Sequence, residues 1–134
     1  MRLFASIVEN SEDAIISKSL EGIITSWNKG AEKIYGYTKD EVIGKHIFLV
    51  IPEENKSEYH LFMDSIIKGK NVKHYETKRK KKNGEIIDVS ISLSPICDLQ
   101  GNLIGVSNTT RDITEKKIKG KVYRDWETDR KSVV

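Results

Sequence analysis

The sequence predicts a mixed α+β domain in which helices cover one face of an antiparallel sheet. Three observations lead to this fold class. First, Asn83-Gly84 is a strong hairpin signal, and apolar and polar residues alternate strictly after it. Second, an amphipathic helix over residues 55–69 precedes this hairpin. Third, two short strands flank a turn near the N-terminus. The full order is strand, strand, short helices, long helix and a meander of three strands. It predicts five strands packed against helices, with room for a pocket between the long helix and the sheet.

The first half of the chain carries clear start and stop signals. Residues 1–10 are expected to form an amphipathic helix, with Leu3, Phe4, Ile7 and Val8 on one face. Residues 14–19 and 23–27 predict two strands joined by a turn at Gly22, and Trp27 is expected in the core or at an interface. Asn28 is expected to cap the helix that begins at Lys29, which has Ala31, Ile34 and Tyr35 on one face. The spacing Thr38–Glu41 predicts a capping box, and Gly44 ends the second short helix.

The second half is more regular. The long helix has cap spacing at Asn55–Glu58, and its apolar positions are Tyr59, Phe62, Met63, Ile66 and Ile67. Residues 71–79 predict a strand. After the turn, Ile87, Val89, Ile91 and Leu93 alternate with polar residues, so one face of that strand is expected to be buried. Residues 103–111 predict the last strand of the meander, with Ile104 and Val106 on one side. A further helix is expected to begin at Asp112.

Length and composition restrict the protein class. The 134 residues fit one domain, and 37% apolar with 32% charged residues is typical of a soluble globular protein. The single cysteine, Cys97, excludes an internal disulfide framework and fits a reducing compartment. The apolar run at residues 3–8 is too short for a signal peptide, and the run at 47–51 is too short to span a bilayer. We therefore expect a cytoplasmic location without direct membrane contact, as a free protein or as the cytoplasmic part of a membrane-bound receptor.

Five segments, in this order, resemble the PAS domain family: residues 23–32, Tyr35-Gly36-Tyr37, residues 41–45, residues 81–85 and residues 111–115. The resemblance covers roughly residues 3–119 and implies a five-stranded antiparallel sheet with a helical cap. It also implies a sensory module that binds a ligand or cofactor, or that dimerises, upstream of an output domain such as a histidine kinase. In this family the motif formed here by Asp112, Ile113 and Thr114 joins the last strand to the output helix.

These considerations divide the chain at residue 119. Residues 1–119 are expected to form the sensory domain, with residues 112–119 as the start of the output helix. Residues 120–134 read as an irregular polar tail, either a linker or a segment foreign to the domain. Gly120 would interrupt a helix there at a cost of about 1 kcal/mol.

A binding pocket is expected between the long helix and the sheet, lined mainly by apolar side chains. Asn108 is the polar exception among them, so it is either a specificity contact or a partner for a backbone group. The candidate pocket residues are Ile16, Ile24, Ile34, Phe62, Ile66, Val89, Ile91, Ile104, Val106 and Asn108.

The sequence does not identify a cofactor, and we expect that the domain binds none. In haem-binding relatives the ligating histidine stands where Tyr59 stands here, and His60 is one residue later, a turn of about 100° on a helix. His60 is therefore a weak haem-ligand candidate, and no metal site is expected. The flavin adduct chemistry of light-sensing relatives needs a cysteine near residues 45–50, where none occurs. Cys97 reads as a small apolar residue at a strand end.

Other chemistries have little support. Residues 78–82 form a basic run that leads into a hairpin turn without interleaved aromatic residues, so we expect solvated charges and no nucleic-acid binding. Motifs for phosphate loops, metalloprotease helices and serine nucleophile elbows are absent, so we expect no enzymatic activity of the chain itself.

Two functions remain from different classes. The first is a signal-transduction input module of a two-component system, sensing a small molecule and acting on an attached or partner output domain. The second is a ligand-free interaction module, which would form a homodimer through Leu3, Phe4, Ile7, Val8 and the outer sheet face. Ligand binding in the pocket would distinguish them.

Overall fold

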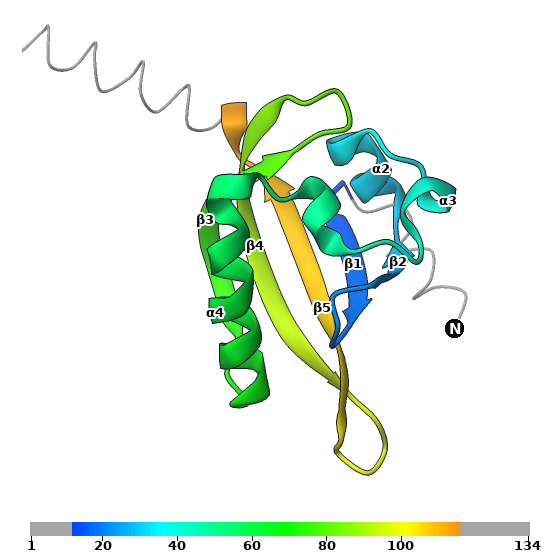
Figure 1. Ribbon diagram of the computed structural model, residues 1–134, viewed down its shortest axis with the longest axis vertical. Helices are drawn as coiled ribbons and strands as arrows, with labels where there is room; N and C mark the ends of the chain where they lie inside the picture. Colours follow the sequence, from blue (N-terminus) through cyan, green and yellow to red (C-terminus); the bar gives the residue numbers. More distant parts are fainter. Residues whose placement is uncertain (1–11, 116–134) are drawn as a thin grey trace, which may run out of the picture.

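The computed structural model describes residues 12–115 and shows a five-stranded antiparallel sheet with the strand order β2-β1-β5-β4-β3. The strands are β1 (Ala14–Ser19), β2 (Ile24–Trp27), β3 (Val72–Lys80), β4 (Ile86–Cys97) and β5 (Leu103–Asp112). All four neighbouring pairs are antiparallel. The last strand therefore lies between the N-terminal and the C-terminal hairpin (Figure 1).

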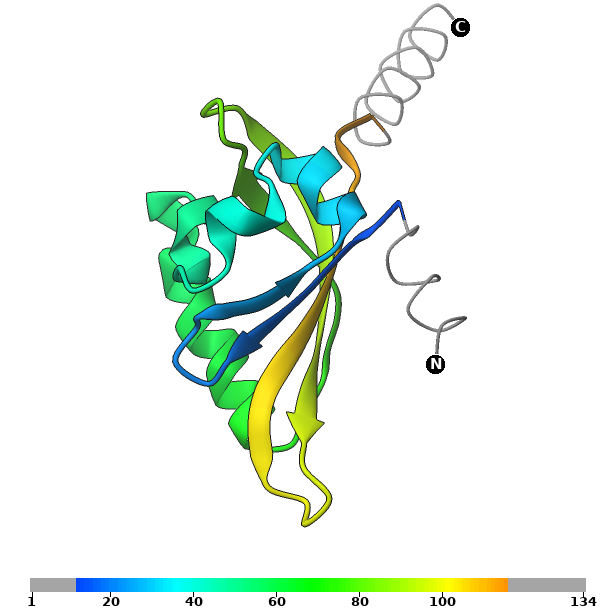
Figure 2. The ribbon, with the colours of Figure 1, turned by 90° about the vertical axis from the view of Figure 1, so that its right-hand side faces the viewer.

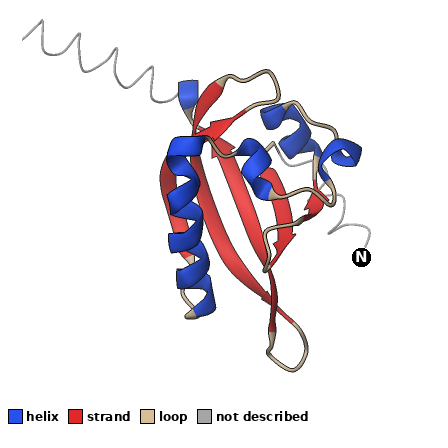
Figure 3. Ribbon diagram, in the orientation of Figure 1, coloured by secondary structure: helices blue, strands red, loops and turns tan. Residues whose placement is uncertain are grey.

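The helices lie on one face of this sheet, as the sequence predicts (Figures 2 and 3). Two short helices, α2 (Lys29–Tyr35) and α3 (Lys39–Val42), follow β2, and two 3-10 turns, η1 (Ile47–Val50) and η2 (Glu53–Asn55), come next. The long helix α4 (Lys56–Ile67) lies over β3 and β4 (Figure 1). No helix within residues 12–115 has the length and apolar character needed to cross a bilayer.

The core lies between the helices and the inner face of the sheet. On β4 the predicted alternation is confirmed, because Ile87, Val89, Ile91 and Leu93 are buried and the residues between them are more exposed. On α4 the buried residues are Tyr59, Phe62, Met63 and Ile66.

Two apolar residues expected on the inner side are exposed. Ile67, the last residue of α4, is 67% exposed because it lies about 100° around the helix from Ile66. Ile104 is 53% exposed, although it has the same parity as Val106. The pairing of β1 with β5 ends at Gly105, and a register irregularity lies opposite, at Ile96 and Cys97. Ile104 therefore lies in the part of the β4–β5 hairpin that extends beyond the helical cover (Figure 1).

The predicted caps are mostly present. Asn28 Oδ1 accepts from the Ala31 N–H at 2.9 Å and also from the Ile15 N–H at 2.9 Å, so it caps α2 and fastens that helix to β1. Thr38 and Glu41 form the expected capping box. Asn55 occupies the cap position of α4, but its side chain makes no cap bond. Its amide instead donates to Thr77 Oγ1 at 3.2 Å, because β3 offers an acceptor there.

Trp27 is 2% exposed, and its indole N–H donates to the Tyr37 carbonyl at 3.0 Å, so it belongs to the core. The predicted helix at residues 1–10 lies outside the described residues, and so do the tail from residue 120 and all but the first two residues of the exiting helix.

Gly22 and Gly44 provide a matched pair for testing backbone geometry. Both have positive φ, 86° and 87°, but a Cβ on Gly22 would lie 2.6 Å from both His46 Nε2 and Tyr59 Oη, whereas Gly44 has open space. We expect Gly44→Ala to cost about 1 kcal/mol of unfolding free energy because of its φ alone. Gly22→Ala should cost at least about 1 kcal/mol more, since it also overpacks the core. Urea unfolding of both variants measures the difference, and equal losses would contradict the contact.

Candidate functional site

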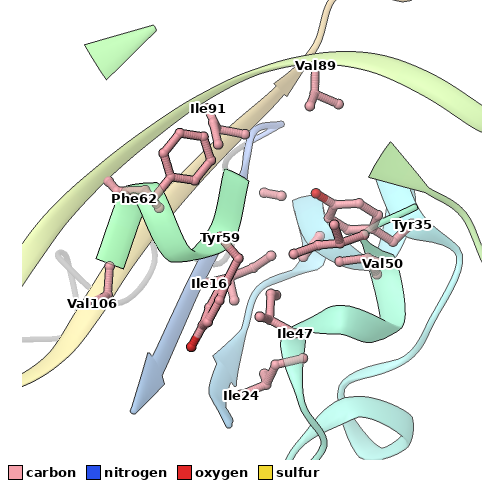
Figure 4. Close-up of a cluster of buried hydrophobic side chains, with 14 of the residues drawn as sticks. Ile16, Ile24, Tyr35, Ile47, Val50, Tyr59, Phe62, Val89, Ile91 and Val106 are labelled. Carbon is pink, nitrogen blue, oxygen red and sulfur yellow. The ribbon is translucent and has the colours of Figure 1, made fainter. Parts of the chain in front are cut away.

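A small cavity lies between α4, η1 and the inner face of the sheet. Its walls come from β1, α2, η1, α4, β3, β4 and β5, and several of them are labelled in Figure 4. The cavity has a volume of about 10 Å³, enough for about one water molecule. The lining residues are Lys18, Tyr35, Ile47, Val50, Ile51, Tyr59, Phe62, Arg79, Ile91, Leu93 and Asn108.

The structure brings only part of the expected pocket set to this cavity. Phe62, Ile91 and Asn108 line it. The other inward residues, Ile16, Ile24, Ile66, Val89 and Val106, are buried in the surrounding core. Ile34 is half-buried and borders an outer groove next to Asp112, and Ile104 is exposed on the projecting hairpin.

Two cations, Lys18 and Arg79, line the cavity, and sequence analysis missed both. Each is 4% exposed. Arg79 belongs to the basic run at residues 78–82, whose charges were expected to be solvated, and for Arg79 that expectation is wrong. In β3, Thr77 and Arg79 both face inward because alternate residues share a face. The same parity links Lys18 to Ala14 and Ile16 in β1, and this was the signal available in the sequence.

The rest of the basic run engages acidic neighbours on the surface. Lys78 pairs with Asp88 at 2.8 Å, and Lys81 lies 3.7 Å from Glu85. Lys82 reaches Glu41 at 2.5 Å. These contacts place the lysines within mixed-charge clusters around the β3–β4 hairpin.

Arg79 has a carboxylate partner. Its Nη1 lies 3.7 Å from Glu58 Oε1 and donates to the Lys78 carbonyl at 2.7 Å. Glu58 is itself held in place, because Oε1 accepts from the Thr77 hydroxyl at 2.5 Å and from the Asn55 amide at 3.3 Å. Burial lowers the pKa of Arg79, yet a guanidinium keeps its proton in proteins.

Lys18 has an aromatic partner in place of a carboxylate. Its Nζ lies 5.1 Å from the centre of the Tyr59 ring, a cation–π contact. Burial, followed by the charge of Arg79, lowers the pKa of Lys18 from 10.5 to about 8, and no carboxylate opposes this shift. Glu21 is the acidic group near this contact, and together with burial it raises the pKa of Tyr59. Lys18 is therefore still mostly protonated at neutral pH while lying in the core.

A chain of polar groups runs from the cavity along β5. Thr110 is fully buried; its hydroxyl donates to Asn108 Oδ1 at 3.2 Å and shares a hydrogen bond with the Tyr35 hydroxyl. Burial raises the pKa of Tyr35; the charge of Arg79 and the hydrogen bond with Thr110 oppose this shift, and the charge of Asp112 adds to it. Asn108, Thr110 and Asp112 are alternate residues of one strand, so their side chains lie along the same face of β5 from the cavity to the end of the sheet.

The junction after β5 is held by hydrogen bonds to β4. Asp112 Oδ1 accepts from the Thr114 N–H at 3.0 Å, so its carboxylate stabilises the start of the exiting helix. The N–H of Ile113 donates to the Asp88 carbonyl at 2.9 Å, and the Ile113 side chain is buried. The Thr114 hydroxyl accepts from the Asp88 N–H at 3.1 Å and donates to the Asp88 carbonyl at 3.3 Å. Every residue of the expected relay motif thus has a defined position.

The histidine and cysteine candidates lie away from the cavity. His60 is exposed, whereas Tyr59 lines the cavity, as the 100° step between them requires. Cys97 is exposed and is the last residue of β4, in agreement with its expected place at a strand end. Within residues 12–115, no group of His, Cys, Asp and Glu side chains is arranged to hold a metal ion. The cavity is far smaller than the several hundred Å³ of typical cofactor sites, so neither haem nor flavin fits this arrangement of side chains.

Comparison with known proteins agrees with this architecture. A family model described as PAS domain matches residues 12–115. The PAS domain of a Colwellia psychrerythraea protein superposes with a TM-score of 0.78 at 27% identity, covering 85% of this chain and 97% of that one. An RNA-binding Light-Oxygen-Voltage receptor superposes with a TM-score of 0.79 at 16% identity, covering 98% of this chain and 37% of that one. That second likeness concerns the fold alone.

Among curated proteins, the signal transduction histidine-protein kinase AtoS of Escherichia coli (strain K12) is 27% identical over 111 residues. The match covers 83% of this chain and 18% of AtoS. Phytochrome B of Arabidopsis thaliana is 23% identical, over 99% of this chain and 12% of its own length. The chain therefore spans less than a fifth of the curated relatives that it matches.

The buried ammonium of Lys18 predicts an unusual dependence of stability on pH. Between pH 8 and pH 10.5 the unfolded chain keeps the Lys18 proton while the folded chain releases it, so the unfolding free energy should rise with pH in this window. The full rise is on the order of 3 kcal/mol, since each pKa unit corresponds to about 1.4 kcal/mol. Arg79 and the Tyr59 ring face Lys18, and Arg79 is itself paired with Glu58.

Urea unfolding between pH 7 and pH 9.5 tests this, with Lys18→Met as the comparison. The pKa values of Tyr35 and Tyr59 are raised from 10.0 in the folded chain, so above about pH 10 the unfolded chain loses these protons first and stability falls; the range stops short of that. The Lys18→Met variant should be more stable than the wild type at pH 7 and should lack the rise. A rise of equal size in both proteins would show that Lys18 is not its source.

Proposed function

This chain belongs to the PAS domain family, and we propose that its pocket senses a small molecule and acts on the segment that follows Asp112. The family and its kinase and phytochrome relatives make it a sensor domain of signalling proteins. In this proposal the output is an attached or partner domain, such as the histidine kinase region of a protein resembling AtoS, located in the cytoplasm. Catalysis belongs to that output domain.

The observation that carries the proposal is the shared face of β5. Asn108 lines the cavity, Thr110 bonds to Asn108 and Tyr35, and Asp112 holds the first turn of the exiting helix. A change in the cavity that displaces Asn108 would act on Thr110 and through it on Tyr35, and the charge of Asp112, the next residue on that face of the strand, acts on Tyr35 from the junction. Coupling needs such a contiguous set of contacts together with an element that can change state.

The alternative, a ligand-free dimerisation module, would use Leu3, Phe4, Ile7 and Val8, which lie outside the described residues. The outer sheet face was the second part of that hypothesis. Its central positions are Ser90, Ser92 and Thr109, so the exposed face is polar there. The polar chain leading from the pocket favours the sensory proposal over this one.

Thr110 and Thr109 form a matched pair for testing the relay, because they are neighbours on opposite faces of β5. Thr110→Val keeps the shape of the side chain but removes the bonds to Asn108 and Tyr35. We expect the Thr114 amide to exchange about two- to fivefold faster, since a hydrogen bond contributes about 1 kcal/mol. Thr109→Val should leave that rate unchanged. Hydrogen exchange by NMR, compared at equal global stability, gives the result, and equal rates in both variants would contradict the relay.

Asp112 can be tested separately as the residue that holds the junction. Asp112→Ala removes the acceptor for the Thr114 N–H and should speed exchange at Thr114 and Glu115 about fivefold, while the sheet amides remain protected. Asp112→Asn retains an oxygen acceptor and should lie between the alanine variant and the wild type. Unchanged exchange in Asp112→Ala would mean that the carboxylate does not stabilise this turn.

A further inference from the structure

Two buried cations, Lys18 and Arg79, line the pocket, and one half-buried carboxylate, Glu58, pairs with Arg79. Arg79 is 3.7 Å from Glu58, and hydrogen bonds from Thr77 and Asn55 hold that carboxylate in place. Lys18, equally buried, contacts the face of Tyr59 and is repelled by Arg79. Charges removed from water are normally paired, because the desolvation cost otherwise destabilises the fold. An anion beside Lys18 would supply the missing partner.

The rest of the cavity restricts what that anion can be. Apart from the two cations, the polar groups that line the cavity are Asn108, which can donate through its amide, and the hydroxyls of Tyr35 and Tyr59. The remaining wall of the cavity is mainly apolar and includes Val50, Phe62 and Ile91, which are labelled in Figure 4. A site that combines buried cations with a mainly apolar lining fits an anion that is itself amphipathic.

We propose that this pocket binds a small aliphatic carboxylate, with its carboxylate group at the Lys18 ammonium and its hydrocarbon part against the apolar wall. The inference rests on the proposed sensory function and names the chemical class of its ligand. The carboxylate accepts a charge-assisted hydrogen bond from Lys18, and such bonds are stronger than neutral ones.

Room for the ligand comes from Tyr59. The cavity holds about one water, so a carboxylate group must displace a side chain, and the Tyr59 ring is the group already in contact with Lys18. Tyr59 is 9% exposed, at the outer side of the core, and Phe48 and His46 pack around it. Exchanging the ring for a carboxylate replaces a cation–π contact with an ion pair, which is the stronger interaction in a desolvated site.

The test is a titration of the full chain with acetate, and with acetamide as the neutral molecule of the same shape. Isothermal titration calorimetry and amide NMR spectra at pH 7.5 would follow binding. We expect acetate to bind and to shift the resonances of Asn108 and Tyr59. Acetamide should bind at least tenfold more weakly. At pH 8 acetate binding should also take up protons, since the carboxylate keeps Lys18 charged.

Two lysines provide matched variants. Lys56 also lies over an aromatic ring, 5.3 Å from the centre of Phe48, but it is half-buried and paired with Glu53. Lys18→Met should weaken acetate binding at least tenfold, and Lys56→Met should leave it unchanged. Equal weakening in both, or acetamide binding as well as acetate to the wild type, would overturn the proposal. So would saturation with inorganic phosphate but not with acetate.

The acetate titration and the relay experiment test different claims, so a negative result in one does not decide the other. The comparison of Thr110→Val with Thr109→Val needs no ligand, so it tests the connection between pocket and junction alone. A working relay without acetate binding would overturn the ligand class and keep the sensory function. Acetate binding without any change at Thr114 in Thr110→Val would keep the site and overturn the relay.

Discussion

The structure depends on the position of β5 at the centre of the sheet. This strand pairs with β1 from Gly105 to Thr110 and with β4 from Leu103 to Asp112, so it joins two hairpins that have no other strand pairing between them. The helices rest on the surface that this pairing creates. The chain leaves the sheet from this strand. The exit point is therefore next to a strand that is paired on both sides, and not next to an edge strand with unpaired backbone groups.

Polar residues buried against this strand give the domain its specific character. An apolar core would have served stability alone, since burying charges is costly even when they are paired. Here Lys18, Arg79, Asn108, Thr110 and Tyr35 share one interior region. Within residues 12–115, every fully buried side-chain nitrogen or oxygen atom has a hydrogen-bond partner. Asn108, Thr110 and Tyr35 are joined by hydrogen bonds, and such a network can be rearranged by a change in one member, which an apolar core does not permit as readily.

The fold was predictable from sequence because its signals are local. The alternation in residues 87–93, the helical spacing from Tyr59 to Ile66 and the caps at Asn28 and Thr38 each act over a few residues, and the structure bears them out. The pocket was harder to predict, because its composition depends on which strands meet. Lys18 and Arg79 are 61 positions apart in the sequence, and hydrophobicity alone assigns both to the surface. The burial predicted for Ile104 was wrong for the opposite reason: Ile104 is apolar, but it lies beyond Gly105, where the pairing of β5 with β1 ends, and it is exposed.

The central place of β5 also has a consequence for how the chain folds. Ala14 pairs with Thr110, so the first and last strands must meet across almost the whole described length of the chain. Contacts of such large sequence separation slow folding, because the entropy of closing the loop is lost before the contact forms. During synthesis, the β1–β2 and β3–β4 hairpins are made before β5, and they cannot join into one sheet until β5 pairs with both. The segment that carries the exit is thus the one whose arrival completes the domain.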